Sequence, residues 1–398
     1  MNNDTKLKVY SLGGITIIMI MANTMLFPIF PDMRRAMELN LEQISLMVLI
    51  VALPAAILSP VGGILADIWG RKKIIVPSML LYGIAGGSAG LAIILGEQPY
   101  YTVLFFRLLQ GIGSAAPMYL AVALAGDIFQ SSQRTKTMGF IETSNGLGKL
   151  LSPIIGGAAG MIAWYAPFFI YPLVSIPAAL IVWIFIKESP PQQKISLRSE
   201  LTSCSHLLRL SSLLPLVTGL LAVLFLFGTM FWIGKIIDKQ IPDGTIIYGL
   251  VISLPVAALM ITTYFSSPFT SKIGARLTLF TGLFIAGISL VLIPLTFGTF
   301  LLWLNVVLLG IGAGLLLPML DTIATAVAER GHRGIITNIF GGFRSLGAAV
   351  APYFIALLLD RGLFATFLPI AAGCFSLGGI ILALARDEDM LPPKLREN

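Results

Sequence analysis

Charged residues are scarce in this sequence. Asp, Glu, Lys and Arg make up 11% of the 398 residues, whereas soluble domains carry about 25%. Only two cysteines, Cys204 and Cys374, and two histidines, His206 and His332, are present. These numbers predict neither a disulfide framework nor a metal cluster. Because 57% of the residues are hydrophobic, the chain could not cover its surface in water, and we expect the lipid bilayer to be its solvent.

Several motifs of soluble chemistry are also missing. The sequence has no G-x-x-x-x-G-K-[ST] phosphate loop, hydrolase triad, zinc motif or dinucleotide fingerprint. We therefore expect no ATP drive, no cofactor and no enzymatic activity, and an ion gradient remains as the energy source. A membrane-embedded enzyme would need a buried His/Asp/Glu cluster, which is not visible. A receptor would need a signalling domain, for which tails of roughly a dozen residues leave no room.

Long apolar stretches dominate the chain. A helix needs about 20 mostly apolar residues to cross a bilayer, and twelve such stretches are present. They are 9–30, 43–66, 74–95, 100–125, 138–161, 166–186, 213–234, 246–265, 277–297, 300–325, 336–358 and 364–384. Asn40 and Gln43 have the spacing of a capping box at the start of the second span. The sequence thus predicts an all-α integral membrane protein.

Lysine and arginine set the predicted orientation. With the N-terminus in the cytoplasm, 18 of the 26 basic residues fall in inside segments and 5 in outside loops. Inside loops carry an excess of Lys and Arg, so we expect both termini in the cytoplasm. This distribution explains the net charge of +7 without nucleic acid. The absence of a targeting peptide and the short loops favour a bacterial cell membrane.

The two halves of the chain resemble each other. Residues recur at an offset of 199 at the same place in the predicted topology: Gly111-Ile112-Gly113 as Gly310-Ile311-Gly312, and Arg134, Gly148 and Pro153 as Arg333, Gly347 and Pro352. A polar connection rich in proline and glutamine separates the halves. We predict two six-helix pseudo-repeats, 1–186 and 213–398, joined by a cytoplasmic linker, 187–212.

The loop after the second span reads Gly62-Gly63-Ile64-Leu65-Ala66-Asp67-Ile68-Trp69-Gly70-Arg71-Lys72-Lys73. Its glycines permit a tight turn, and its acid lies near basic residues that could hold one conformation. The alternative is an ordinary positive-inside loop. This order and spacing resemble the motif between spans two and three of the major facilitator superfamily. The family often has a basic residue where Ile68 stands.

The resemblance extends over the whole chain and implies the twelve-span fold of the drug:proton antiporter branch. It implies a conformational latch on the inner side, formed by Gly63, Asp67, Gly70, Arg71, Lys72, Asp127 and Arg134. For Asp127 and Arg134 the alternative is a solvated ion pair of little energetic value.

The fourth span contains Phe106-Arg107-Leu108-Leu109-Gln110-Gly111-Ile112-Gly113. An arginine within a span is costly to bury and is a functional candidate, and Arg107, Gln110 and Ser114 share one helical face. The stretch resembles the family's span-four motif of proton-coupled members. The alternative is an arginine that snorkels to the outer surface.

The fifth span contains small residues at Gly146, Gly148, Pro153, Gly156 and Gly157. Small residues let helices pack closely in lipid. The spacing resembles the antiporter motif of the superfamily's exporters, with Ser152 in place of a glycine. A helix that simply packs closely is the alternative.

Other polar residues of the spans are candidates for proton coupling. Glu142, Asn145 and Lys149 share one face of the fifth span, where a carboxylate beside a lysine could exchange a proton. Arg344 occupies the position equivalent to Asn145, and Asp321, toward the inner end of the tenth span, is expected at a similar depth. Each acid and base could instead form a structural ion pair.

The first span has Asn23 and Thr24 but no central acid, although many exporters of cationic drugs place a carboxylate there. A cavity that is neutral to positive favours neutral, zwitterionic or anionic amphiphiles.

These observations predict a monomeric proton-coupled exporter of a small amphipathic compound. The alternatives are a lipid or glycolipid flippase on the same fold and a metabolite importer.

Overall fold

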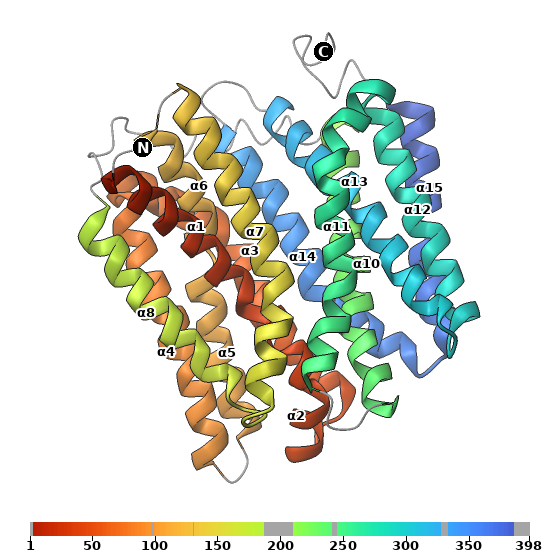
Figure 1. Cartoon of the computed structure of the whole chain (residues 1–398), viewed down its shortest axis with the longest axis horizontal. Helices are drawn as coiled ribbons and strands as arrows, with labels where there is room; N and C mark the ends of the chain where they lie inside the picture. The colour runs from red at the N-terminus through yellow and green to blue at the C-terminus, as the bar shows by residue number, and fades with distance from the viewer. Residues whose placement is uncertain are drawn as a thin grey trace. The chain divides into compact units, whose positions relative to one another are not determined.

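The computed structural model of the chain describes residues 3–96, 99–129, 131–186, 210–240, 245–327 and 333–385, and every element in them is a helix (Figure 1). The helices are α1 (Asn3–Thr24), η1 (Phe27–Ile29), α2 (Phe30–Ala36), α3 (Leu41–Trp69), α4 (Arg71–Leu95), α5 (Tyr100–Ser114), α6 (Pro117–Ile128), α7 (Ser131–Gly160), α8 (Pro167–Phe185), α10 (Leu210–Gln240), α11 (Thr245–Ile273), α12 (Ala275–Thr296), α13 (Leu301–Val327), α14 (Arg333–Leu359) and α15 (Leu363–Leu384).

The described helices confirm the predicted membrane fold. Eleven segments within the described residues are long and apolar enough to cross a bilayer. The remaining predicted span, 138–161, corresponds to α7, which carries more polar side chains than the other long helices. Asn40 and Gln43 form the predicted capping box at the start of α3, because each side chain accepts a hydrogen bond from the other residue's backbone N–H.

Two of the predicted spans are interrupted helices. The first span comprises α1, η1 and α2, and the fourth comprises α5 and α6. Proline lacks the N–H that would continue a helix, and each restart has one in its first turn: Pro28 in η1, Pro31 in α2 and Pro117 in α6. These breaks leave backbone carbonyls inside the apolar region, where they need other donors.

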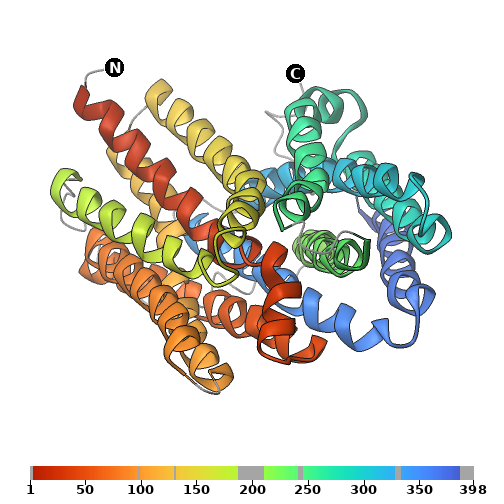
Figure 2. The same ribbon diagram turned by 60° about the horizontal axis from the view of Figure 1, so that its bottom comes forward.

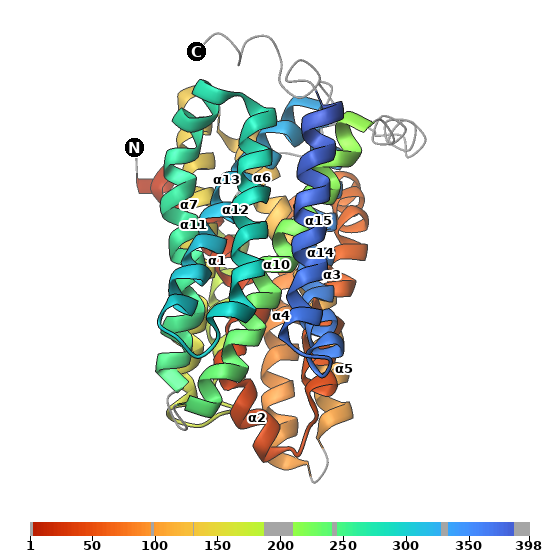
Figure 3. The same ribbon diagram turned by 90° about the vertical axis from the view of Figure 1, so that its right-hand side faces the viewer.

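The chain separates into two compact units. Unit 1 comprises Met1–Ser196 and Gly234–Ser253, and unit 2 comprises Leu197–Ile233 and Leu254–Asn398. In unit 1, α1 runs between α7 and α8 (Figure 2). In unit 2, α12 lies between α13 and α15 (Figure 3).

The same close approaches recur within each unit and account for the sequence repeat. A Cβ added to Gly111 of α5 would lie 2.4 Å from the Val51 carbonyl oxygen of α3, and one added to Gly310 of α13 would lie 2.1 Å from the Pro255 oxygen of α11. Only glycine allows backbones to approach this closely. The repeated glycines are therefore packing requirements of two equivalent helix pairs.

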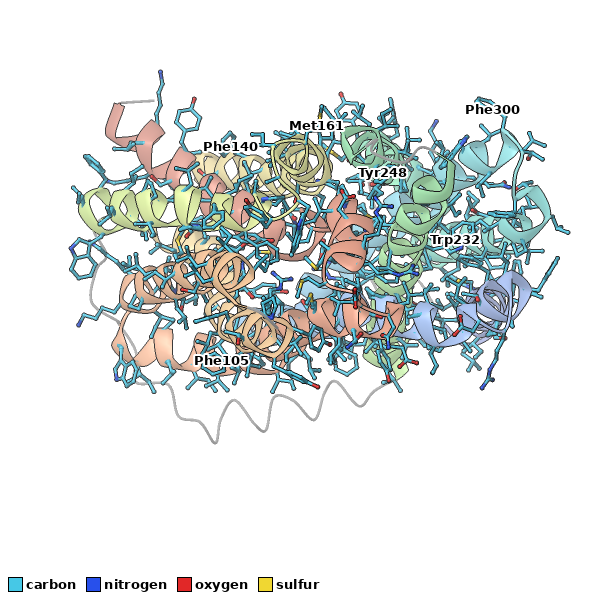
Figure 4. All side chains as sticks on the ribbon, turned by 90° about the horizontal axis from the view of Figure 1, so that it is seen from below. Phe105, Phe140, Met161, Trp232, Tyr248 and Phe300 are labelled. Atoms are coloured by element: carbon cyan, nitrogen blue, oxygen red, sulfur yellow. The ribbon has the colours of Figure 1, made fainter. Side chains whose placement is uncertain are left out.

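Large apolar side chains occupy both the interior and the surface. Trp232 is buried, and its ring centroid lies 4.8 Å from that of Phe367. Phe105 and Phe300 are exposed and point outward (Figure 4). Exposed aromatic and aliphatic residues along the helices suit a surface that faces lipid.

Candidate functional site: a buried arginine at the end of the first helix

Arg107 of α5 lies inside unit 1 and is 0% exposed. Its Nη1 donates to the Ala22 carbonyl oxygen at 3.0 Å and to Gln110 Oε1 at 2.6 Å, and its Nε donates to the Met47 carbonyl oxygen at 3.4 Å. The bond to Gln110 confirms that these two residues share a face of α5. The snorkelling alternative is wrong, because the guanidinium points toward α1 and α3 and reaches no surface.

The acceptors explain how the positive charge is tolerated. Ala22 is among the last four residues of α1, whose carbonyls lack the usual helical partner. These carbonyls form the negative end of the helix dipole, which favours a cation. The fold therefore places a guanidinium where a broken helix supplies both hydrogen-bond acceptors and partial negative charge.

Two buried tyrosines that the sequence reading missed complete this region. Tyr171 of α8 donates its hydroxyl to the Ala22 carbonyl oxygen at 3.0 Å, and Tyr82 of α4 donates to the Ile18 carbonyl oxygen at 3.1 Å. Their ring centroids are 5.5 Å apart in an edge-to-face arrangement. Tyr82 lies near the middle of α4, and a tyrosine there is a signal in the sequence, because tyrosine in membrane proteins is enriched at the interfaces and a buried hydroxyl requires a partner. Tyr171 lies near the start of α8, so its position in the span gave no such signal.

Three residues spaced four apart on α7, Gly148, Ser152 and Gly156, face α1. A Cβ on Gly148 would lie 2.4 Å from Ile20 Cγ2, and one on Gly156 would lie 1.8 Å from the Met25 carbonyl oxygen. Between them, Ser152 Oγ accepts a hydrogen bond from Thr24 Oγ1 at 2.9 Å. The serine that replaces the motif's glycine therefore links α7 to the last residue of α1.

Another side of α7 contacts the first part of α11 within unit 1. A Cβ on Gly249 would lie 2.3 Å from the Pro153 carbonyl oxygen, and Ser253 Oγ donates to the Leu150 carbonyl oxygen at 2.9 Å. The span-five pattern is thus in contact with two helices. Gly146 is partly exposed and Gly157 is buried.

The proposed proton-coupling face of α7 is only partly described. Asn145 Oδ1 is buried and has no hydrogen-bond partner among the described residues. Lys149 is half-buried. The side chains of Glu142 and Asn23 lie outside the described part of the structure. The expected Glu142–Lys149 pair therefore stays a prediction.

In unit 2, Arg344 and Asp321 form the predicted ion pair. Arg344 Nη1 lies 2.7 Å from Asp321 Oδ1, and the two side chains are 24% and 46% exposed. The arginine stem crosses Gly219 of α10, where an added Cβ would lie 3.1 Å from Arg344 Cγ. The pair joins α13 to α14, and both side chains are partly exposed rather than buried in the core.

The loop between α3 and α4 shows why its glycine is needed. Gly70 has a φ of 100° and Gly274, at the equivalent junction of α11 and α12, has a φ of 85°, a conformation that side-chain-bearing residues rarely adopt. Lys72 Nζ lies 5.1 Å from the centroid of the Trp183 ring of α8, a cation–π distance.

The remaining latch candidates are less fully placed. Gly63 and Arg71 are partly exposed. The side chains of Asp67, Asp127 and Arg134 lie outside the described residues, so their predicted contacts are untested. Within the described residues, no group of three His, Cys, Asp or Glu side chains could hold a metal ion.

Comparison with known proteins places this geometry in context. The Major Facilitator Superfamily model matches residues 12–242 and 242–397. The Bacillibactin exporter of Bacillus subtilis (strain 168) is 26% identical over 368 residues, which cover 90% of this chain and 92% of that protein. The class B tetracycline resistance protein of Escherichia coli is 30% identical over 192 residues, which cover 48% of this chain and 45% of that protein.

A solved structure shares the fold. The crystal structure of a bacterial homolog of the human lysosomal transporter Spinster, in an inward-facing and unoccupied conformation, matches with a TM-score of 0.73 and 16% identity, covering 99% of this chain and 100% of that chain. At this identity the likeness concerns the arrangement of helices alone.

Proposed function

We propose that this chain, which belongs to the Major Facilitator Superfamily, exports a small amphipathic compound across the cell membrane in exchange for protons. Family membership makes it a membrane transporter rather than an enzyme. The two halves, 1–186 and 213–398, would alternate access to a central site, as in transporters built from two parallel repeats. The segment 187–212 would link them.

The observation that carries the proposal is the packing of α7 against α1. Gly148 and Gly156 allow the two helices to approach, and Ser152 is hydrogen-bonded to Thr24. This is the segment whose pattern resembles the antiporter motif of exporters. Relatives named as an exporter and as a resistance protein support the outward direction of transport.

Proton coupling is assigned to the ionisable and polar residues of the spans. Arg107 is a buried charge held by neutral acceptors, and ionisable groups in spans commonly mark ion pathways. On α7, the buried Asn145 Oδ1 can accept a hydrogen bond, and Glu142 is the proposed proton carrier beside Lys149. In unit 2, Asp321 supplies a second carboxylate, and Arg344 is the cation paired with it.

The charge of these residues bears on the substrate. The first span has no acid at its centre, and Arg107, Lys149 and Arg344 contribute positive charge against Glu142 and Asp321. Such a cavity favours neutral, zwitterionic or anionic amphiphiles over dications. The inner loops that contain Asp67–Lys73 and Asp127–Arg134 would hold the outward-facing form, with both termini in the cytoplasm.

Inside-out membrane vesicles test this proposal. In energised vesicles, a fluorescent amphiphile is expected to accumulate inside when the protein is present, and a protonophore is expected to abolish the accumulation. The Arg107→Ala variant should give no accumulation at an equal amount of protein in the membrane, because it removes the buried cation. Arg35→Lys is the control, since Arg35 is exposed and pairs with Asp32 at the surface.

Two outcomes would contradict the proposal. Accumulation that survives the protonophore would rule out proton coupling. Absence of accumulation for every amphiphile, together with scrambling of a labelled phospholipid in liposomes, would instead favour a flippase.

A further inference from the structure

The carbonyl of Ala22 is the point at which α5 and α8 contact the end of α1. Helix α1 ends at Thr24, within the apolar segment Lys6–Ala36. A carbonyl without a partner in this environment is costly. The Ala22 oxygen receives two donors, Arg107 Nη1 from α5 and the Tyr171 hydroxyl from α8, each at 3.0 Å. Both lone pairs of the carbonyl are thus used.

Tyr171 and the Arg107 guanidinium meet at this carbonyl, because both donate to the same oxygen. Gln110 Oε1 accepts from Arg107 on the other side, at 2.6 Å. We call Arg107, Gln110 and Tyr171 around the Ala22 carbonyl the α1-end cluster. Arg107 and Gln110 belong to α5 and Tyr171 belongs to α8, so the cluster joins these two helices to the end of α1.

The α1-end cluster has more donors than acceptors. Gln110 is 0% exposed, and its Nε2 has no hydrogen-bond partner among the described residues. Gly86 of α4 provides the space for this arrangement, because a Cβ there would lie 2.7 Å from Tyr171 Cβ and 2.9 Å from Gln110 Nε2. Because acceptors are few, the Ala22 carbonyl orients both Arg107 and Tyr171, which donate to it.

Tyr82 provides an internal comparison. Its hydroxyl donates to the Ile18 carbonyl oxygen at 3.1 Å, but Ile18 lies inside α1, where the carbonyl also accepts from the backbone N–H four residues later. Tyr82 and Tyr171 are both fully buried and adjacent. Only the Tyr171 hydroxyl serves a carbonyl that the helix itself leaves unbonded.

We infer that Tyr171 is a positioning residue for transport. It holds the Arg107 guanidinium and the end of α1 in one arrangement, and the movement of α1 during the cycle breaks and remakes this contact. Removal of the hydroxyl leaves Arg107 as the sole described side-chain donor to the Ala22 carbonyl and allows the η1–α2 segment to move. The inference rests on the proposed transport function, but its first test does not require a substrate.

The test compares Tyr171→Phe with Tyr82→Phe, since each change removes one buried hydroxyl and keeps the ring. Amide hydrogen exchange of peptides covering residues 22–36 is measured in the purified full chain. Tyr171→Phe is expected to speed exchange there by about tenfold, the scale expected when a buried carbonyl loses a donor, whereas Tyr82→Phe leaves it within about twofold. Equal exchange in both variants and wild type would overturn the inference.

Transport is the second readout. Tyr171→Phe should lower the maximal rate of amphiphile export about tenfold with an unchanged KM, and Tyr82→Phe should export normally. Faster exchange with a normal maximal rate would reduce Tyr171 to a structural role and contradict the inference. If the wild-type chain exports nothing, the proposed function fails, while faster exchange confined to Tyr171→Phe would still support the contact at Ala22.

Discussion

At the scale of single residues, Arg107 and Arg344 are held differently within their spans. Arg107 is fully buried and donates to two backbone carbonyls and an amide, whereas Arg344 pairs with the carboxylate of Asp321 and keeps partial exposure. The planar guanidinium of Arg107 directs several donors at once, which a lysine ammonium on a flexible stem does not reproduce. Charge alone therefore does not define the role of Arg107.

This difference predicts that Arg107→Lys is not a conservative change. Lysine keeps the charge but leaves some of the acceptors at Ala22, Met47 and Gln110 unbonded, at a cost of about 1–3 kcal/mol for each buried group. We expect the export rate to fall about tenfold or more, measured at equal protein amounts in the membrane. Arg35→Lys, at an exposed pair, should export normally, and normal export by Arg107→Lys would show that a positive charge is sufficient.

The residue scale also shows what the sequence could and could not predict. The Asn40–Gln43 capping box follows from local spacing, and the structure confirms it. The orientation of the Arg107 side chain could not be predicted from the sequence, because a rotamer that points inward and one that snorkels to the surface are both compatible with it. It is decided by the end of α1, which lies 85 residues away in the chain. The same long-range packing makes Tyr171 part of the site.

At the scale of elements, α1 and α7 are joined by backbone proximity rather than by large side chains. Without a hydrophobic driving force between helices in lipid, close packing and interhelical hydrogen bonds hold them together. Gly156 is the tightest of these contacts, since an added Cβ would overlap the Met25 carbonyl oxygen at 1.8 Å. A backbone atom cannot rotate away as a side chain can.

We therefore predict that Gly156→Ala separates α1 from α7. The midpoint of thermal unfolding in detergent should fall, as expected for overpacking that costs about 1–3 kcal/mol, and export should decrease. Gly14→Ala is the matched control, because Gly14 lies in α1 and an added Cβ there meets no atom within 4 Å. Alanine at position 14 should keep or raise the midpoint; equal behaviour of the two variants would contradict close packing at Gly156.

The helices of the first and fourth spans are interrupted near prolines. Pro28, Pro31 and Pro117 signal these breaks in the sequence, yet each span is long and apolar enough to read as one continuous helix. A proline within a span does not always end a helix: Pro153 lies inside α7 and Pro54 inside α3. Which proline interrupts a helix depends on the donors that neighbouring helices supply to the freed carbonyls.

At the scale of the whole molecule, the sequence predicted the internal repeat because the same positions in both halves require glycine. Gly111 and Gly310 meet a backbone carbonyl in their own units, and Gly70 and Gly274 both have a positive φ. The polar residues do not follow the repeat: Asn145 in the first half corresponds to Arg344 in the second. These glycine contacts and conformations thus recur, whereas the groups proposed to couple protons differ between the halves.

Proton-coupled export can be measured with the purified chain in liposomes that contain a trapped pH-sensitive dye. A pH gradient is imposed, and cationic, neutral and anionic amphiphiles are added in turn. We predict proton flux that is triggered by a neutral or anionic amphiphile and is lost in Glu142→Gln, because the amide cannot carry the proton. Substrate movement without proton flux, or flux that is unchanged in Glu142→Gln, would contradict this prediction.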